Sequence, residues 1–257
     1  MRYAWIEQHR DQYTVSQLCR VLEVSRSGYC QWRVRPPSKT AVSNQALDAK
    51  VAAVHKSSRR SYGRHRIVQS LRQQGEIVSA ERVRKSLQRQ GLRPVYRRPF
   101  VVTTDSNHRL PVAENLLDRR FDSWQTDQAW VADITYVPTG EGWLYLAAVM
   151  DLAGRRIVGW SMSETIDATL VCTALKSAWW QRKPSKGVLV HTDRGSQYAS
   201  GQYRALADEL GITMSMSRKA NAWDNAPMES FFKTLKVERV HQVRYETRAQ
   251  ARQDIVD

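Results

Sequence analysis

Three carboxylates in the second half of the sequence stand at positions where a structural protein would rarely place them. Asp133 lies in the middle of the apolar run 129–137, where a lone charge is costly unless it has partners. Asp193 directly follows the apolar run 188–192, at the point where an α/β sheet presents side chains to a crevice. Glu229 lies one turn into a helical pattern. We expect these three acids, carried by three elements, to converge.

Their chemistry follows from the types of ligand. Carboxylates without histidine or cysteine partners suit a hard cation that prefers oxygen, such as Mg²⁺ or Mn²⁺. Two such ions, about 3.5–4 Å apart, would activate a water or sugar hydroxyl and stabilise the leaving oxygen of a phosphodiester. The sequence has neither a GxxxxGK[ST] nor a GxGxxG motif, so nucleotide-driven chemistry has no support. The pattern predicts metal-dependent phosphodiester chemistry.

Each acid also has a structural alternative, because a single carboxylate is more often salt-bridged or a helix cap than a metal ligand. Asp151 follows an apolar run too, but the Leu-Ala-Gly that comes after it is typical of a turn. Glu229, Lys233 and Lys236 share one side of a regular helix, and a carboxylate beside two lysines is well placed next to a phosphate chain.

The elements that hold the acids are predicted from the hydrophobic pattern. Apolar segments separated by short turns indicate a meander of strands at 129–137, 143–150 and 156–162. Helix and strand patterns then alternate at 168–180 (helix), 187–192 (strand), 202–210 (helix), 212–217 (strand) and 226–237 (helix). This order predicts a mixed α/β fold of the RNase H-like type, a five-strand sheet with helices on both faces.

The positive charge of the chain is confined to its first part. Residues 1–110 hold 22 Lys+Arg and 7 Asp+Glu, whereas residues 111–257 hold 18 of each. A basic half joined to a neutral half indicates a polyanion-binding module attached to a second function. A basic surface that serves only solubility is the alternative.

Two helical units account for this basic half. In residues 1–38, Thr14 and Ser25 are candidate N-caps of two short helices joined by a tight turn, which predicts a helix-turn-helix; an ordinary helical hairpin is the alternative. Residues 39–93 predict a second basic helix-turn-helix unit, and residues 94–110 predict a linker to a core at 111–257. The candidate phosphate contacts are Arg26, Arg64, Arg66, Arg84 and Lys85.

Three blocks of the neutral half match a known family. The block His191-Thr-Asp-Arg-Gly-Ser-Gln-Tyr-Ala-Ser200, the block Asn221-Ala-Trp-Asp-Asn-Ala-Pro-Met-Glu-Ser-Phe-Phe-Lys-Thr-Leu-Lys236 and the run 130–137 resemble the integrase core of bacterial insertion-sequence transposases, in particular the OrfB protein of the IS-three family. Thirty-five residues separate Asp193 from Glu229, as in the D-D-E triad of that branch. Residues 61–67, 83–92 and 115–121 extend the resemblance into the basic half and the lead into the core.

The resemblance implies a DNA transposase that binds terminal repeats and target DNA, cleaves strands and transfers them. It implies Asp133, Asp193 and Glu229 as catalytic and metal-binding residues, two Mg²⁺ or Mn²⁺ ions, a homo-oligomer on DNA and an upstream-frame (OrfA) partner. Lys233, Lys236, Arg194 and Gln197 would contact DNA. His191 would position substrate, or it is a core histidine with satisfied hydrogen bonds.

Two other functions compete with this one. The helical pattern that begins at Thr247 stops at Asp257. One alternative is therefore a truncated, non-catalytic DNA-binding protein that competes for the element ends. A plain RNase H-type nuclease is disfavoured, because it would not need 110 basic residues of helical apparatus.

Composition excludes several further classes. A hydrophobic content of 42% with nine tryptophans excludes a disordered tail protein. The chain has no long apolar segment and no signal-peptide pattern at Met1, so we expect a cytoplasmic protein that has no membrane partner. The resemblance to insertion-sequence transposases implies that this cytoplasm is bacterial and that the protein is associated with the nucleoid. Cys19, Cys30 and Cys172 are odd in number and lack CxxC spacing, so we expect buried thiols rather than disulfides or a zinc knuckle.

Overall fold

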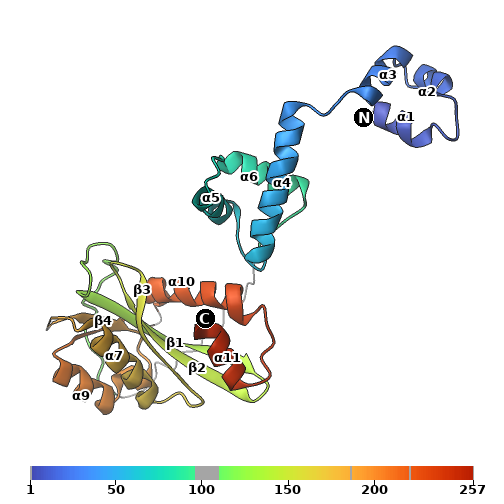
Figure 1. The fold of residues 1–257 in the computed structure, drawn as a ribbon. Helices are drawn as coiled ribbons and strands as arrows, with labels where there is room; N and C mark the ends of the chain where they lie inside the picture. The colour runs from blue at the N-terminus through green and yellow to red at the C-terminus, as the bar shows by residue number, and fades with distance from the viewer. Residues whose placement is uncertain (1, 96–109, 186, 220, 257) are drawn as a thin grey trace. The chain divides into compact units, whose positions relative to one another are not determined.

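The computed structural model describes residues 2–95, 110–185, 187–219 and 221–256. It divides into two compact units, Met1–Pro94 and Val95–Asp257 (Figure 1). Most of the linker predicted at 94–110 lies outside the described residues. Within them, no helix is both long enough and apolar enough to cross a membrane.

The first unit begins with three short helices, α1 (Arg2–His9), α2 (Val15–Val21) and α3 (Arg26–Val34). The predicted caps are present: the Thr14 side chain accepts from the backbone N–H of Gln17, and the Ser25 side chain accepts from that of Gly28. The buried core of these helices consists of Ile6, Leu18, Cys19 and Tyr29. The expectation of three buried thiols is wrong for Cys30, which is exposed on α3, where it faces away from that small core.

Three more helices complete the first unit, α4 (Lys39–Ser57), α5 (Arg64–Gln73) and α6 (Ala80–Arg89). Gly75 and Gly91 follow α5 and α6 with φ of 83° and 64°, a left-handed conformation that ends a helix at little cost for glycine. Their apolar faces form a second core of Leu47, Val51, Val54, Ile67, Val68, Leu71, Val78, Val83 and Leu87.

The predicted mixed sheet of five strands is confirmed in the second unit. Its strands are β1 (Ala129–Thr139), β2 (Gly142–Asp151), β3 (Arg156–Ser163), β4 (Leu189–Thr192) and β5 (Thr213–Met216). They lie in the order β3-β2-β1-β4-β5, with β1, β2 and β3 antiparallel and β4 and β5 parallel to β1. Asp151 is the last residue of β2, and it supports the predicted turn, because its carboxylate accepts from the backbone N–H groups of Asp127 and Gly154, at 2.9 and 2.8 Å.

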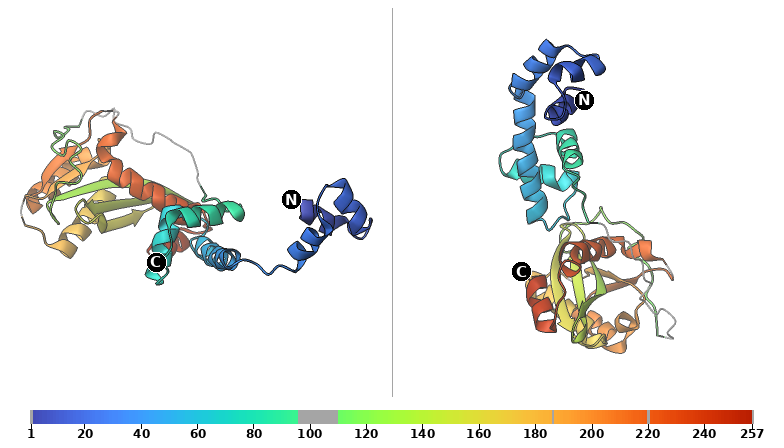
Figure 2. Two further views of the ribbon diagram at one scale, coloured as in Figure 1. Left: turned by 90° about the horizontal axis from the view of Figure 1, so that it is seen from above. Right: turned by 90° about the vertical axis from the view of Figure 1, so that its right-hand side faces the viewer.

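Helices cover both faces of this sheet (Figures 1 and 2). One face carries α7 (Ala168–Arg182), the short α8 (Ser196–Ala199) and α9 (Gly201–Leu210). The other carries α10 (Ala226–Leu235) and α11 (Arg248–Val256). A 3₁₀ turn, η1 (Ala222–Asn225), precedes α10, and a π-helical turn, η2 (Lys236–Val240), follows it.

Candidate active site

The pairing of β1 with β4 brings two of the candidate acids side by side. Val131 is the partner of His191 in this parallel register, which ends there. Continued by two residues, the same offset of 60 reaches Asp133 and Asp193, one residue beyond the end of β4, and the charge of Asp193 acts on Asp133. Parallel neighbours carry residues of equal offset at the same height. Strand pairing therefore joins two carboxylates that are far apart in the sequence.

The third acid is brought to the same strand by α10. Asn225, the residue before this helix, donates from its side-chain nitrogen to the backbone carbonyl of Ala132 at 3.2 Å. Glu229 lies in the first turn of the helix. A hydrogen bond next to Asp133 thus fixes the start of the helix that carries Glu229.

The electrostatics of the site follow from this arrangement. Burial raises the pKa of Asp133 well above its ordinary value, and the neighbouring charge of Asp193 raises it further. The backbone N–H of Ile134, which donates to Asp133 Oδ1 at 2.8 Å, acts in the opposite direction. Glu229 adds a smaller repulsion, and burial raises its own pKa.

The three carboxylates do not form one closed cluster as they stand. Asp133 and Asp193 are neighbours, while Glu229 remains exposed on α10. No three His, Cys, Asp or Glu side chains in the described part of the chain come together closely enough to hold one metal ion.

The surroundings of the aspartate pair nevertheless fit a hard divalent cation. The hydroxyl of Tyr198 and the side-chain oxygen of Asn225 are both buried and have no hydrogen-bond partner. Burial raises the pKa of Tyr198 well above its ordinary value, and the charge of Asp133 adds to this effect. Carboxylate, amide and hydroxyl oxygens are the donor set that Mg²⁺ and its bound waters prefer.

Lys236 lies closer to the acids than a helix-surface lysine would. It is half-buried in the first position of η2; burial lowers its pKa, and the charge of Asp133 opposes that change. Lys233 is exposed on α10. The prediction placed Glu229, Lys233 and Lys236 on one side of a helix. In the structure Glu229 and Lys233 are exposed, whereas Lys236 is half-buried near Asp133.

Of the two alternatives for His191, the structure supports the core histidine. Its ring is fully buried, with Nδ1 at 2.8 Å from Ser215 Oγ and Nε2 at 3.1 Å from Ser217 Oγ. Burial lowers its pKa to about 4, so the ring is neutral at pH 7. Arg194 is anchored as well, because its Nε donates to the carbonyl of Ser217 at 2.6 Å. Gln197 is half-buried, with Nε2 at 3.5 Å from the carbonyl of Ile166.

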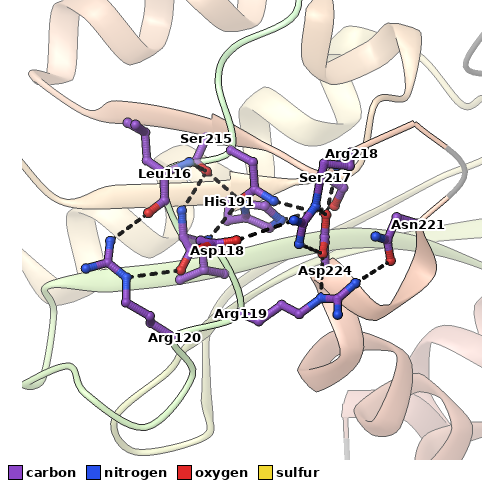
Figure 3. A network of polar contacts seen from close by, with 12 residues as sticks. Leu116, Asp118, Arg119, Arg120, His191, Ser215, Ser217, Arg218, Asn221 and Asp224 are labelled. Atoms are coloured by element: carbon purple, nitrogen blue, oxygen red, sulfur yellow. Dashed lines mark hydrogen bonds and ion pairs between the residues drawn. The ribbon is translucent and has the colours of Figure 1, made fainter.

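Sequence reasoning missed Asp224, a fully buried carboxylate with several polar partners (Figure 3). Arg218 donates to it from its backbone N–H, from Nε and from the terminal nitrogen, at 2.9, 2.9 and 2.8 Å. Arg119 Nε donates at 2.8 Å and the Asn115 side chain at 3.0 Å. The hydrogen bonds from Arg218 are the largest cause of a pKa far below the ordinary value, so Asp224 is ionised.

This ion-pair cluster anchors the segment that leads into α10. Asn115 and Arg119, which lie in the segment before β1, bind Asp224, and Arg119 also binds Asn221. Asp224 lies five residues before Glu229. The signal in the sequence was Asp224, the one aspartate of the Asn221-to-Lys236 block, for which that block offers no arginine partner. No local pattern identifies Arg119 as that cation, because the two residues are 105 positions apart.

The predicted DNA contacts of the first unit lie on helices and are at least partly exposed. They are Arg26 on α3, Arg64 and Arg66 on α5, and Arg84 and Lys85 on α6. Arg84 already donates two hydrogen bonds to Glu81, at 2.8 and 2.6 Å. This pair is exposed, so water and salt screen it and a phosphate can compete for the guanidinium.

Comparison with known proteins agrees with both units. Residues 124–222 and 229–257 each match a family described as an integrase core domain, and residues 43–100 match an HTH-like domain. Among solved structures, the catalytic core domain of HTLV-2 integrase in complex with magnesium is 14% identical, with a TM-score of 0.37 over 43% of this chain and 68% of that one.

Curated relatives match over most of their length. The chain is 42% identical over 234 residues to the insertion element IS600 uncharacterized 31 kDa protein of Shigella sonnei. This match covers 91% of this chain and 86% of the relative. It is 44% identical over 244 residues to the transposase InsF for insertion sequence IS3A of Escherichia coli K12, which covers 94% of this chain and 84% of the relative. An identity of this size across both units shows that the chain belongs to the IS3 family of insertion-sequence transposases.

Proposed function

We propose that this transposase cleaves and joins DNA strands at Asp133, Asp193 and Glu229. The observation that carries the proposal is the parallel pairing of β1 with β4, which sets the two aspartates side by side. The hydrogen bond between Asn225 and Ala132, which holds the start of the Glu229 helix against β1, supports it. A polynucleotidyl transferase with an integrase core needs such an acidic site.

The same three side chains would hold the metal, which we propose to be two Mg²⁺ or Mn²⁺ ions. Bound there, the ions would activate the attacking water or 3′-hydroxyl and stabilise the leaving oxygen. Asp133 and Asp193 would bind from the sheet, and Glu229 would close the site from α10. The Tyr198 hydroxyl and the Asn225 side-chain oxygen, both without a partner, would orient ordered water around the aspartates.

Basic side chains near the acids would hold the substrate. Lys233 is exposed one helical turn after Glu229 and would contact a backbone phosphate. Lys236 would balance the charge of Asp133 and reach the same strand. Arg194 and Gln197 remain proposed substrate contacts at the turn after Asp193. His191 supports this turn from the core rather than touching DNA.

The basic unit would bind the element ends. We keep 1–38 and 39–93 as the two end-binding modules, 94–110 as the linker and 111–257 as the catalytic core, since the positive charge excess lies in the first 110 residues. Arg26, Arg64, Arg66, Arg84 and Lys85 would contact phosphates. We further propose a homo-oligomer on DNA, assisted by an upstream-frame product, in the bacterial cytoplasm at the nucleoid.

A strand-joining assay tests this proposal. The full chain is incubated with Mg²⁺, a target duplex and a labelled duplex that carries a candidate element end, and wild type is compared with Asp193→Ala. We expect joining by the wild type, loss of joining in the variant and end binding in both. A wild-type protein that binds ends but never joins them would support the competing hypothesis of a non-catalytic end-binding protein. Equal joining by Asp193→Ala would refute the site assignment.

A further inference from the structure

Trp223 is an exposed tryptophan on the segment that leads to the catalytic helix. Its relative exposure is 74%, whereas the next two residues, Asp224 and Asn225, are buried at 0% and 4%. Large aromatic side chains usually bury their surface, and one kept in water beside a functional site is a candidate for binding. The three successive residues of η1 thus combine two anchors with one solvent-facing indole.

The backbone that carries Trp223 is held from several directions. Asp224 is bound by Arg218 and Arg119, and Asn225 donates to the carbonyl of Ala132. Arg119 also donates to the side-chain oxygen of Asn221 at 2.9 Å, so the start of the segment is fixed as well (Figure 3). A rigid aromatic side chain loses little conformational entropy when it binds a partner.

The charge around Trp223 indicates the class of partner. Between Ser217 and Asn225 the sequence has two cations, Arg218 and Lys219, and one carboxylate, Asp224. The carboxylate is buried in ion pairs, while Lys219 and part of Arg218 are exposed. Arg218 also lies 3.5 Å from the exposed carboxylate of Asp118, so Lys219 supplies the positive charge that the segment adds at its surface. A positive charge beside an exposed indole favours a polyanion with aromatic groups over a second protein surface.

We infer that Trp223 stacks on an unpaired nucleobase of the DNA strand that enters the active site. This inference rests on the proposed catalytic role of Glu229. Trp223 lies six positions before Glu229 in the sequence. At a helical rise of about 1.5–2.0 Å per residue this is about 9–12 Å, or about three nucleotides along a strand. We therefore expect the base that stacks on Trp223 to lie a few nucleotides from the reacting phosphate, where the last pairs of a DNA end open most easily.

The test uses a duplex whose last few base pairs are mismatched, with 2-aminopurine at each unpaired position in turn. The full chain is bound without divalent metal, so that no strand is joined. We expect wild type to quench the probe, Trp223→Ala to leave it bright and Trp223→Phe to restore most of the quenching. Affinity should fall about tenfold in Trp223→Ala, and by much less when the unpaired positions are abasic.

Trp180 provides the matched control. It is 69% exposed at the last turn of α7, the helix layer on the opposite face of the sheet from α10, and Trp180→Ala should quench and bind as wild type does. Equal quenching by Trp223→Ala and wild type would overturn the inference. The inference would also fail if Trp223→Ala lost as much affinity on abasic DNA as on DNA with unpaired bases. So would a DNA-free oligomer, seen by sedimentation, that only Trp223→Ala loses. Strand joining is measured on the same proteins, so that the stacking role of Trp223 and the proposed catalytic function are tested separately. A wild-type protein that quenches the probe but does not join strands would count against the catalytic assignment alone.

Discussion

At Asp133, burial and a like charge act in the same direction. Both favour the protonated carboxyl, and only the N–H of Ile134 and the amine of Lys236 favour the carboxylate. A divalent cation at this place would reverse the balance, because it stabilises the ionised form of both aspartates. The pKa of Asp133 should therefore change when a neighbouring charge is removed or a cation is added.

Asp193→Asn should lower the pKa of Asp133. The substitution removes the neighbouring negative charge but leaves the burial, which is the larger cause, so the pKa should fall and still remain above its ordinary value. Carbon-detected NMR titration of the carboxyl groups measures it. Asp208→Asn, an exposed position on α9, is the control and should leave Asp133 unchanged. An unchanged pKa in Asp193→Asn would mean that the two carboxylates are not neighbours.

His191 should make the stability of the second unit depend on pH. Its pKa is about 4 in the fold, against an ordinary value of 6.5, so below pH 6.5 the unfolded chain takes up a proton that the folded chain refuses. The contribution is complete above pH 6.5 and is lost as pH falls towards 4, by at most about 3 kcal/mol. Urea unfolding followed by tryptophan fluorescence measures it. His191→Gln should flatten this part of the profile.

At the scale of elements, the sequence predicted what local patterns encode. The five strands and the caps at Thr14 and Ser25 follow from hydrophobic period and turn chemistry. So does the placement of the acids within β1, directly after β4 and on α10. Some boundaries moved, since β1 runs on through Pro138 to Thr139 and pairs there with β2. The catalytic roles themselves stay predictions.

The features that the sequence did not reveal depend on distant partners. Helix α1 contributes one fully buried residue, Ile6, to its core, so its eight residues show no clear period. The π-helical turn after α10 has no sequence signature, although it decides where Lys236 lies. The Asp224 cluster joins residues more than a hundred positions apart, and such ion pairs are visible only in the folded chain.

Asp224→Asn should loosen the entry into α10. The change removes the charge that three neighbours bind, and because Arg218 and Arg119 are nearly half exposed the cost should be moderate, about 1–3 kcal/mol of unfolding free energy. We expect faster hydrogen exchange at residues 221–230 and at least a tenfold loss of strand joining. Asp118→Asn removes a more exposed partner of Arg218, at 3.5 Å, and should cost less than about 0.5 kcal/mol. Unchanged exchange in Asp224→Asn would exclude the anchoring role.

At the scale of the whole molecule, the charge is divided unequally along the chain, between residues 1–110 and residues 111–257. Residues 1–110 carry the whole excess of 15 positive charges, as the difference 22 − 7 shows, and the remainder is neutral. A neutral core gains little from long-range attraction to DNA, so we expect residues 1–110 to supply most of the attraction.

Fragments 1–110 and 111–257 should therefore differ in their binding to duplex DNA of arbitrary sequence. We expect the first to bind more tightly, with the logarithm of its affinity falling linearly against the logarithm of salt concentration as counterions are released. The second should bind far more weakly and with a shallower slope. Fluorescence anisotropy over a salt series measures both, and similar slopes for the two fragments would contradict this division of labour.

The parallel register of β1 and β4 has a consequence for how the chain tolerates changes in length. Strand pairing, not chain continuity, joins Asp133 to Asp193, so extra residues in the connection at 183–187 would leave that pair intact. Between Asp224 and Glu229 the opposite holds, because each inserted residue turns the glutamate by about 100° around the axis of α10. The interval between the first two acids is thus free to drift in length over evolution, while the interval that ends at Glu229 is locked by helical phase.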